Sequence, residues 1–312
     1  MQNFGFVFPG QGSQKLGMLK GLAEQFPSIL KTFDEASQYI GNDLWEISQQ
    51  DFGNSLDQTH ITQPVLVTAS VAIWRLWSEL GAPKPAILAG HSLGEYSALV
   101  CADVIRFKDA INLVRHRGEF MQEAVPSGTG AMAAIVGLDD YRIQEICDDV
   151  AQGEVVAAAN FNSPGQTVIA GDAEAVKRAM EACKLAGAKR ALPLKISVPS
   201  HCALMRPAAD QLEELLGVVD FSVATIPVVQ NVSAQIATDA NEIKQNLLQQ
   251  LYKPVLWVDS INLMHSAGIQ MLVECGPGKV LCGLIKRIQP DMACFGSDDA
   301  QSFVQAKDEV MV

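Results

Sequence analysis

The pentapeptide Gly90-His91-Ser92-Leu93-Gly94 contains a side chain that could form a covalent intermediate. The apolar residues 86–89 before it predict a short strand, and the small residues after it predict a helix. This order of strand, Gly-x-Ser-x-Gly and helix is typical of a nucleophile elbow, in which glycines avoid a clash and the serine stands at a helix N-terminus. The sequence therefore predicts Ser92 as a nucleophile. The alternative is a tight turn whose serine only caps the helix.

A serine nucleophile needs a general base, and His201 is the best candidate among the five histidines. It follows a proline-fixed extended segment at the point where a predicted insertion returns to the main body, and such junctions collect catalytic groups. The alternative is a histidine with a structural role. His91 is adjacent to Ser92 and should point elsewhere on a tight turn. The other three are expected at the surface or beside arginines: His60, His265 and His116.

No acidic third member of a catalytic triad is convincing. In ordinary α/β hydrolases that residue lies between the serine and the histidine in the chain. The candidates all fall on helices or turns predicted within the insertion: Asp139, Asp140, Asp148, Asp149 and Asp172. This absence counts against a plain lipase or esterase.

Two arginines, Arg115 and Arg117, lie close together in a helix predicted over residues 108–124. Arginines on a helix usually form a solvated surface. If this helix packs beside the elbow, however, one guanidinium could bind a carboxylate through a bidentate pair of hydrogen bonds.

The composition indicates a globular protein with a large core, because 48% of the 312 residues are hydrophobic and 19% are charged. The net charge of −12 weighs against nucleic acid and anionic membranes as partners. No apolar run approaches the length of a membrane span, and the N-terminus resembles a first strand more than a signal peptide. The seven cysteines are scattered and lack a C-x-x-C pair, which predicts reduced thiols in a cytoplasmic protein and no zinc site.

Strands that alternate with helices predict an α/β fold with a largely parallel sheet covered on both faces. The strands are expected at residues 4–8, 86–89, 227–230, 269–274 and 292–295, and the main helices at 18–39, 44–50, 61–81, 108–124, 205–216, 242–251, 255–265 and 280–286. Between them, residues 131–194 follow the β-α-β-β-α-β order of a ferredoxin-like unit. We therefore expect an inserted small domain over 128–197 and a large domain over 1–127 plus 198–312.

Motifs along nearly the whole chain resemble, in the same order, those of malonyl-CoA:acyl carrier protein transacylases. They are Phe8-Pro9-Gly10-Gln11-Gly12-Ser13-Gln14, Gly90-His91-Ser92-Leu93-Gly94-Glu95, Arg117-Gly118 with Met121-Gln122, Asn162-Ser163-Pro164-Gly165-Gln166, Val198-Pro199-Ser200-His201, Gln250-Leu251-Tyr252 with Pro254-Val255, and Glu274-x-Gly276-Pro277-Gly278-Lys279-Val280-Leu281. The resemblance implies an α/β-hydrolase-like large domain interrupted by a ferredoxin-like small domain, in agreement with the order of predicted elements.

The resemblance also implies an acyltransferase of bacterial fatty acid biosynthesis. Such an enzyme moves the malonyl group from malonyl-CoA to the phosphopantetheine thiol of acyl carrier protein through an ester on Ser92. His201 would be the base and then the acid, and the backbone carbonyl of Gln250 would orient its imidazole. The backbone N–H groups of Gln11 and Leu93 would bind the oxyanion.

The same resemblance implies that Arg117 pairs with the malonyl carboxylate, and that no cofactor or metal takes part. Leu93 and Pro199-Ser200 resemble the residues of members that select malonyl over methylmalonyl groups. Supporting roles in the substrate site are implied for five further residues: His91, Met121, Asn160, Asn162 and Asn231.

The expected partners are malonyl-CoA and acyl carrier protein, with the enzyme working as a cytoplasmic monomer without nucleic acid or membrane. Carrier protein is acidic in these systems, and this chain is acidic too, so a local basic patch is expected. Its candidates are Lys184, Lys189, Arg190, Lys195, Lys286 and Arg287. The alternative is an ordinary solvated face.

Three other functions remain open from the sequence. A serine esterase or thioesterase would give the acyl group to water, a stand-alone acyltransferase would serve a polyketide synthase, and a scaffold would bind carrier protein without turnover. Retention of Ser92 and His201 counts against the scaffold.

Overall fold

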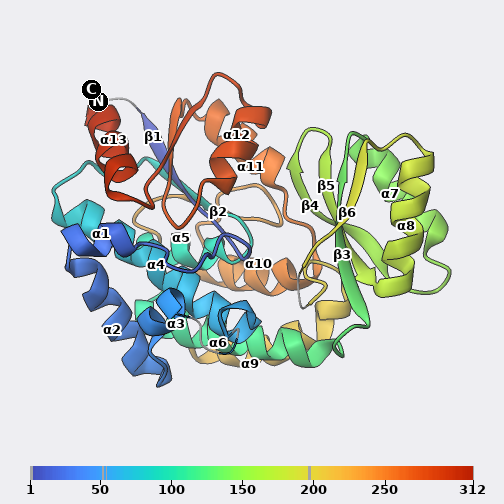
Figure 1. Ribbon diagram of the computed structural model, residues 1–312, viewed down its shortest axis with the longest axis horizontal. Helices are drawn as coiled ribbons and strands as arrows, with labels where there is room; N and C mark the ends of the chain where they lie inside the picture. Colours follow the sequence, from blue (N-terminus) through green and yellow to red (C-terminus); the bar gives the residue numbers. More distant parts are fainter. Residues whose placement is uncertain (1–2, 51–52, 54, 196–197, 312) are drawn as a thin grey trace.

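Two separate sheets organise the computed structural model, which describes residues 3–50, 53, 55–195 and 198–311 (Figure 1). The first sheet has five strands in the order β7-β2-β1-β8-β9, all of them parallel. Its strands are β1 (Phe4–Phe8), β2 (Ile87–Gly90), β7 (Val228–Val229), β8 (Met271–Glu274) and β9 (Ala293–Gly296). The second sheet has four antiparallel strands in the order β4-β5-β3-β6. The predicted fold class is confirmed.

The parallel sheet is buried on both faces, and its central strand shows why. All five residues of β1 are buried. Phe4, Phe6 and Phe8 alternate onto one face, where the ring of Phe6 lies 5.0 Å from that of Trp77. Val7 points to the opposite face and joins a second cluster that includes Trp257. Alternation along a strand thus gives each face its own core.

Helices cover these two faces of the parallel sheet. Those whose apolar residues join the larger core are α1 (Lys20–Gln25), α2 (Ser28–Ile40), α3 (Leu44–Gln50), α4 (Thr59–Glu79), α5 (Gly94–Cys101), α6 (Phe107–Ala124), α9 (Arg206–Val218), α10 (Ala240–Tyr252) and α13 (Ala300–Met311). The second cluster is formed with α11 (Trp257–Ser266) and α12 (Val280–Ile288). The single helix predicted over 18–39 is wrong, because α2 begins again directly after Pro27. No helix among the described residues is long and apolar enough to cross a bilayer.

The antiparallel sheet follows the predicted β-α-β-β-α-β order: β3 (Gly130–Val136), α7 (Asp140–Val150), β4 (Val156–Ser163), β5 (Gln166–Asp172), α8 (Ala173–Leu185) and β6 (Arg190–Pro193). Figure 1 shows α7 and α8 on the side of this sheet that faces away from the parallel sheet. Residues of the other face, including Met132 and Val168, cluster with Cys202 and Leu204 of the main body. The backbone of Val255 bonds to that of Ala159 and Phe161, so β4 is tied to the main body.

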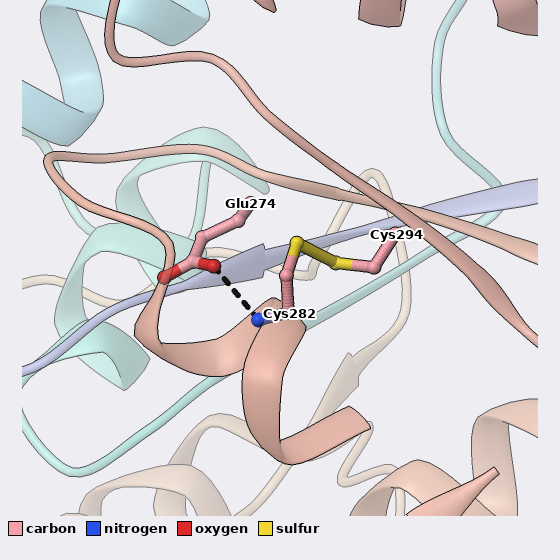
Figure 2. A group of neighbouring side chains, drawn as sticks. All are labelled: Glu274, Cys282 and Cys294. Atoms are coloured by element: carbon pink, nitrogen blue, oxygen red, sulfur yellow. Dashed lines mark hydrogen bonds between the residues drawn. A yellow bond between two sulfur atoms is a disulfide. The ribbon is translucent and has the colours of Figure 1, made fainter. Parts of the chain in front are cut away.

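The structure corrects the expectation that all the cysteines are reduced thiols. Cys282 in the first turn of α12 and Cys294 in β9 form a disulfide (Figure 2). The crossover from β8 through α12 places the start of this helix beside the next parallel strand, a proximity that the spacing of the cysteines does not reveal. The other five cysteines are buried and free.

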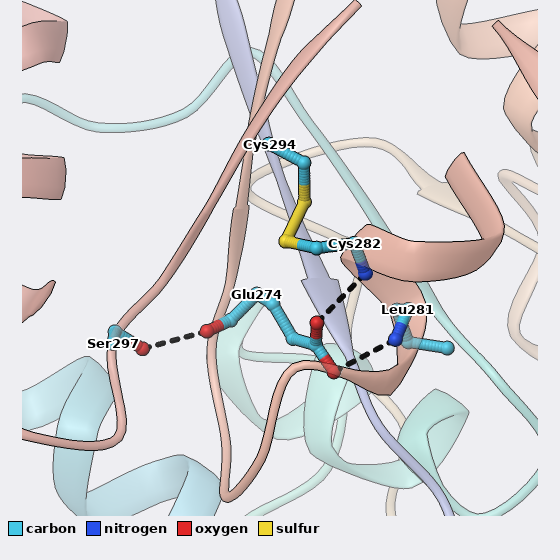
Figure 3. The surroundings of a disulfide bond; sticks show 5 residues. All are labelled: Glu274, Leu281, Cys282, Cys294 and Ser297. Carbon is cyan, nitrogen blue, oxygen red and sulfur yellow. Dashed lines mark hydrogen bonds between the residues drawn. A yellow bond between two sulfur atoms is a disulfide. The ribbon is translucent and has the colours of Figure 1, made fainter. Parts of the chain in front are cut away.

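The carboxylate of Glu274 at the end of β8 lies next to this disulfide and orients α12 (Figure 3). It accepts hydrogen bonds from the backbone N–H groups of Leu281 and Cys282, at 3.0 and 2.8 Å. Burial raises the pKa of Glu274 to about 7, and these two hydrogen bonds oppose that rise. Ligand atoms of Glu274, Cys282 and Cys294 lie within 4.8 Å of one another, as in a metal site. Both sulfurs, however, are in the disulfide and both carboxylate oxygens are engaged.

Candidate active site

The turn between β2 and α5 holds Ser92 in a backbone conformation that the surrounding glycines permit. Ser92 has φ 52°, in the left-handed region. A Cβ at Gly90 would lie 1.9 Å from the backbone carbon of Gly94, and a Cβ at Gly94 would lie 2.0 Å from the carbonyl oxygen of Phe8. Both positions therefore require glycine, as expected for a nucleophile elbow.

His201 lies against this serine although the two residues are far apart in sequence. Its Nε2 is 2.7 Å from the Oγ of Ser92, and its Nδ1 is 2.6 Å from the backbone carbonyl oxygen of Gln250. Because a carbonyl oxygen can only accept, Nδ1 carries the proton and Nε2 presents its lone pair to the serine hydroxyl. This arrangement provides the orientation that a carboxylate provides in a triad, without adding a charge.

The surroundings of His201 keep its imidazole neutral. Burial and then the nearby Arg117 cation lower its pKa to about 3, and the hydrogen bond to Gln250 partly opposes this shift. A neutral imidazole is the form that can accept the serine proton.

Arg117 is turned into the interior of the site and is not a solvated residue. Its side chain is 2% exposed, and its Nη1 and Nη2 donate to the side-chain oxygens of Gln63 and Gln250, at 2.9 and 3.1 Å. Its guanidinium carbon lies 5.6 Å from the centre of the Tyr96 ring. Burial lowers the pKa of Arg117. Arg115, by contrast, is partly exposed and pairs with Glu119 at 3.1 Å.

A cavity of about 220 Å³ joins Ser92, His201 and Arg117. Met121, Asn160 and Asn162 also line it, together with apolar residues from α12 and the second sheet: Met132, Val168, Leu194, Val280, Leu281 and Leu284. The site thus lies between the carboxyl ends of the parallel strands and the face of the antiparallel sheet that its helices leave open.

The two residues predicted to bind an oxyanion both border this cavity. Leu93 is the residue before α5, where backbone N–H groups have no partner within the helix. Gln11 belongs to the loop after β1, and a Cβ at its neighbour Gly10 would lie only 2.5 Å from the carbonyl oxygen of His91. The loop therefore approaches the elbow as closely as glycine allows.

His91 and Asn162 connect the elbow to the second sheet. The Nε2 of His91 lies 2.7 Å from the Oδ1 of Asn162 on β4, and its ring contacts Trp257 edge-on. Burial lowers the pKa of His91, so its neutral ring donates this hydrogen bond. Among the other histidines, His60 was expected at the surface but is half-buried in α4, with Nδ1 at 3.0 Å from the Oε1 of Gln122.

Asn231 lies behind the elbow and does not line the cavity. Its Oδ1 accepts from the backbone N–H of Ser92 at 2.7 Å, and its Nδ2 donates to the carbonyl oxygen of Gly90 at 2.6 Å. Both polar groups are therefore used to hold the turn, which differs from the substrate contact that the sequence predicts.

Three polar parts of the site are not predicted from the sequence: Gln63, Glu95 and the side chain of Gln250. The buried Glu95 stands in the apolar run 94–102, and a charge in such a run is a signal that could have found it. Nothing in the sequence distinguishes Gln63 from a surface glutamine, because its role depends on how α4 packs against α6.

Comparisons with known proteins agree on one family. Residues 5–287 match the model of the acyl transferase domain. The chain is 58% identical over 306 residues to a malonyl CoA-acyl carrier protein transacylase of Escherichia coli, covering 98% of this chain and 99% of that one. It is 53% identical to the protein of the same name from Haemophilus influenzae, over the full length of both.

Solved structures give the same result. An acyl carrier protein S-malonyltransferase from Vibrio cholerae is 56% identical, with a TM-score of 0.96 over 98% of this chain and all of that one. A malonyl-transacylase in complex with a type II polyketide synthase acyl-carrier protein is 54% identical, with a TM-score of 0.98 over 99% of this chain and all of that one.

The lowered pKa of His201 predicts how acylation responds to acid. Because the imidazole stays neutral as the pH falls through the ordinary histidine value of 6.5, His201 should add no titration step to the rate constant of acylation between about pH 8 and pH 5. Rapid-quench acylation by malonyl-CoA measures this constant, with circular dichroism at each pH as the control for folding. The carboxyl of Glu95, whose pKa burial raises to about 7, titrates in this range, so a midpoint at 6.5 or above contradicts the proposed environment of His201 if it persists in Glu95→Gln.

Proposed function

We propose how this chain, which belongs to the malonyl CoA-acyl carrier protein transacylases of the acyl transferase family, moves a malonyl group from malonyl-CoA to acyl carrier protein. The observation that carries the proposal is the buried guanidinium of Arg117 on the wall of the cavity that holds the Ser92–His201 pair. A generic hydrolase has no need of such a buried cation. An enzyme whose acyl group ends in a carboxylate does need one, because the cation can pair with that carboxylate.

In the first half-reaction, Ser92 Oγ attacks the thioester carbonyl while His201 Nε2 takes the hydroxyl proton. The oxyanion forms beside the backbone N–H groups of Gln11 and Leu93. When the C–S bond breaks, the leaving thiolate takes the proton from His201, and the malonyl group remains as an ester on Ser92. The carbonyl of Gln250 accepts from Nδ1 throughout and stabilises the transient imidazolium.

The second half-reaction runs the same steps with a different thiol. The phosphopantetheine thiol of the carrier gives its proton to His201 and attacks the ester carbonyl. The ester C–O bond then breaks, the Oγ of Ser92 takes the proton back, and malonyl carrier protein leaves. Extension of fatty acid chains uses this product.

Arg117 explains why a dicarboxylic acyl group is selected. The malonyl carboxylate would pair with its guanidinium, whereas an acetyl group would leave this buried donor without an anionic partner. Such an unpaired group costs about 1–3 kcal/mol. His91, Asn160, Asn162 and Met121 would shape the remainder of the acyl site.

The organisation of the chain supports three further parts of the proposal. The small-sheet elements all fall within residues 130–193, in keeping with an inserted unit over 128–197 and a large domain over 1–127 plus 198–312. Ser92, His201 and Arg117 line one cavity within a single chain, so the proposed monomer needs no residue from a second copy. The net charge of −12 weighs against nucleic acid and anionic membranes as partners.

A carrier protein of a polyketide synthase is a second candidate acceptor. The similar malonyl-transacylase whose structure contains a type II polyketide synthase carrier supports it. Rates of transfer to the two kinds of carrier protein, compared at equal concentration, decide between them.

Intact-mass spectrometry of the enzyme with malonyl-CoA tests the transfer. Because the ester should wait for a thiol, we expect a single malonyl adduct that persists without an acceptor and disappears when carrier protein bearing phosphopantetheine is added. Rapid loss of the adduct to water without carrier protein would show a thioesterase instead.

Replacement of Arg117 tests the selection of the acyl group. Arg117→Ala should lower kcat/KM for malonyl-CoA by about 10- to 100-fold while acetyl transfer is kept or rises. Arg115→Ala is the matched control on the same helix and should leave both reactions within twofold of wild type, roughly the effect of a surface substitution. Equal losses for malonyl and acetyl groups in Arg117→Ala would exclude a role in selectivity.

The basic patch makes a prediction about carrier docking. Lys286 lies on α12, which lines the cavity through Leu281 and Leu284, and Lys195 directly follows the cavity residue Leu194. Lys286→Glu and Lys195→Glu should slow transfer to carrier protein several-fold at low salt without changing acylation by malonyl-CoA, since charge mainly affects the docking rate.

Lys184 was a candidate for this patch, but it lies in the last turn of the outer helix α8, none of whose described residues lines the cavity, so Lys184→Glu is the control. It should change neither half-reaction. Equal slowing of both half-reactions by Lys286→Glu would show that the helix itself, and not its charge, was disturbed.

A further inference from the structure

Glu95 lies fully buried in the first turn of α5, three residues after Ser92. Its Oε2 accepts from the side-chain Nε2 of Gln250 at 2.6 Å and from the backbone N–H of Asn231 at 3.3 Å. Its Oε1 has no hydrogen-bond partner among the described residues. The mechanism above makes no use of this carboxylate, and a buried carboxylate without a direct ion pair is costly.

The residue that Glu95 contacts, Gln250, touches all three working parts of the site. Its backbone oxygen accepts from His201, and its side-chain Oε1 accepts from Arg117 at 3.1 Å. Its side-chain Nε2 also donates to the backbone carbonyl oxygen of Ser92 at 3.0 Å. The side-chain amide of Gln250 thus joins Arg117 to the turn that holds Ser92. The backbone carbonyl of Gln250 orients His201.

Glu95 and the carbonyl oxygen of Ser92 together determine which way this amide faces. The Nε2 of Gln250 donates to Glu95 Oε2 and to the carbonyl oxygen of Ser92, so the NH₂ group faces these two acceptors. Burial raises the pKa of Glu95 to about 7, and the hydrogen bond from Gln250 favours its ionised form. The amide oxygen is then directed to Arg117, which only donates. These acceptors, of which the carboxylate makes the shorter contact, thereby oppose a flip that would set two donors against each other at Arg117.

We propose that Glu95 is a positioning residue that fixes the Gln250 amide and through it holds Arg117 and the turn of Ser92 in place beside His201. Glu95 touches no reacting atom, so it acts only through its neighbours. Asn231, its second partner, holds the backbone of Gly90 and Ser92. This inference rests on the proposed malonyl transfer and adds the residue that couples its selectivity to its catalysis.

Substitution of Glu95 in the full-length enzyme tests the proposal. Glu95→Ala should lower the acylation rate constant by about 100-fold, because loss of the support displaces the guanidinium and the turn of the nucleophile together. It should also reduce the preference for malonyl over acetyl groups by about tenfold. Glu95→Gln, whose amide oxygen can still accept from Gln250, should retain most of the acylation rate constant and most of the preference for malonyl groups.

A double-mutant cycle separates positioning from general stabilisation. If Glu95 acts through Gln250, adding Glu95→Ala to Gln250→Ala should cost far less than it costs in the wild type, whereas independent effects would add. Glu95→Asp covers the case in which the alanine variant does not fold. Its shorter side chain cannot reach Gln250 in the same geometry, and it should lose selectivity in the same direction.

Leu212→Ala is the control for lowered stability, since Leu212 is a buried residue of α9 that does not line the cavity. It should lower the melting temperature but leave the malonyl-to-acetyl ratio unchanged. A ratio within twofold of wild type in both Glu95→Ala and Glu95→Asp, or additive effects in the cycle, would overturn the proposal, with twofold being roughly the scatter of neutral substitutions. If the wild type forms no malonyl adduct, it is instead the proposed function that fails.

Discussion

The hydrogen bond from His201 Nδ1 to the backbone carbonyl of Gln250 is the interaction on which the site depends. It selects the imidazole tautomer that can accept the serine proton, and it does so without an anion. This matters because Arg117 is buried nearby. A carboxylate in the carbonyl's place would attract the guanidinium and compete with the substrate for it. A neutral acceptor leaves Arg117 available for the acyl group.

The fold holds the serine and the histidine in backbone conformations that are themselves unfavourable and that contacts from neighbouring residues stabilise. Ser92 and His201 both have positive φ, at 52° and 64°. Left-handed residues other than glycine cost about 1–3 kcal/mol each and persist only where their neighbours hold them. The side chain of Asn231 accepts from the backbone N–H of Ser92 and donates to the carbonyl oxygen of Gly90. The backbone N–H of His201 donates to the carbonyl oxygen of Leu251. Ser92 and Asn231 lie two residues after strands β2 and β7, so the parallel sheet supplies rigid support for the elbow.

Much of this could be predicted from the sequence because the signals are local. The elbow depends on glycines beside the serine, and the two sheets depend on the order of short apolar segments. Other features were not predictable because they arise from contacts between distant segments. The Gln63 contact to Arg117 needs the packing of α4 on α6, and the Cys282–Cys294 disulfide needs the crossover into β9. The sequence predicts that Asn231 contacts the substrate, yet its side chain bonds to the backbone of Gly90 and Ser92 in the elbow.

The location of the acyl group tests the central claim most directly. Wild-type enzyme and Ser92→Ala are mixed with malonyl-CoA, quenched in acid, digested with protease and analysed by peptide mass spectrometry. The structure predicts a malonyl group on the peptide that contains Ser92 in the wild type and no malonylated peptide in the variant. A malonyl group on any other residue of the wild type, or a labelled peptide from Ser92→Ala, would contradict a mechanism built on Ser92 and His201.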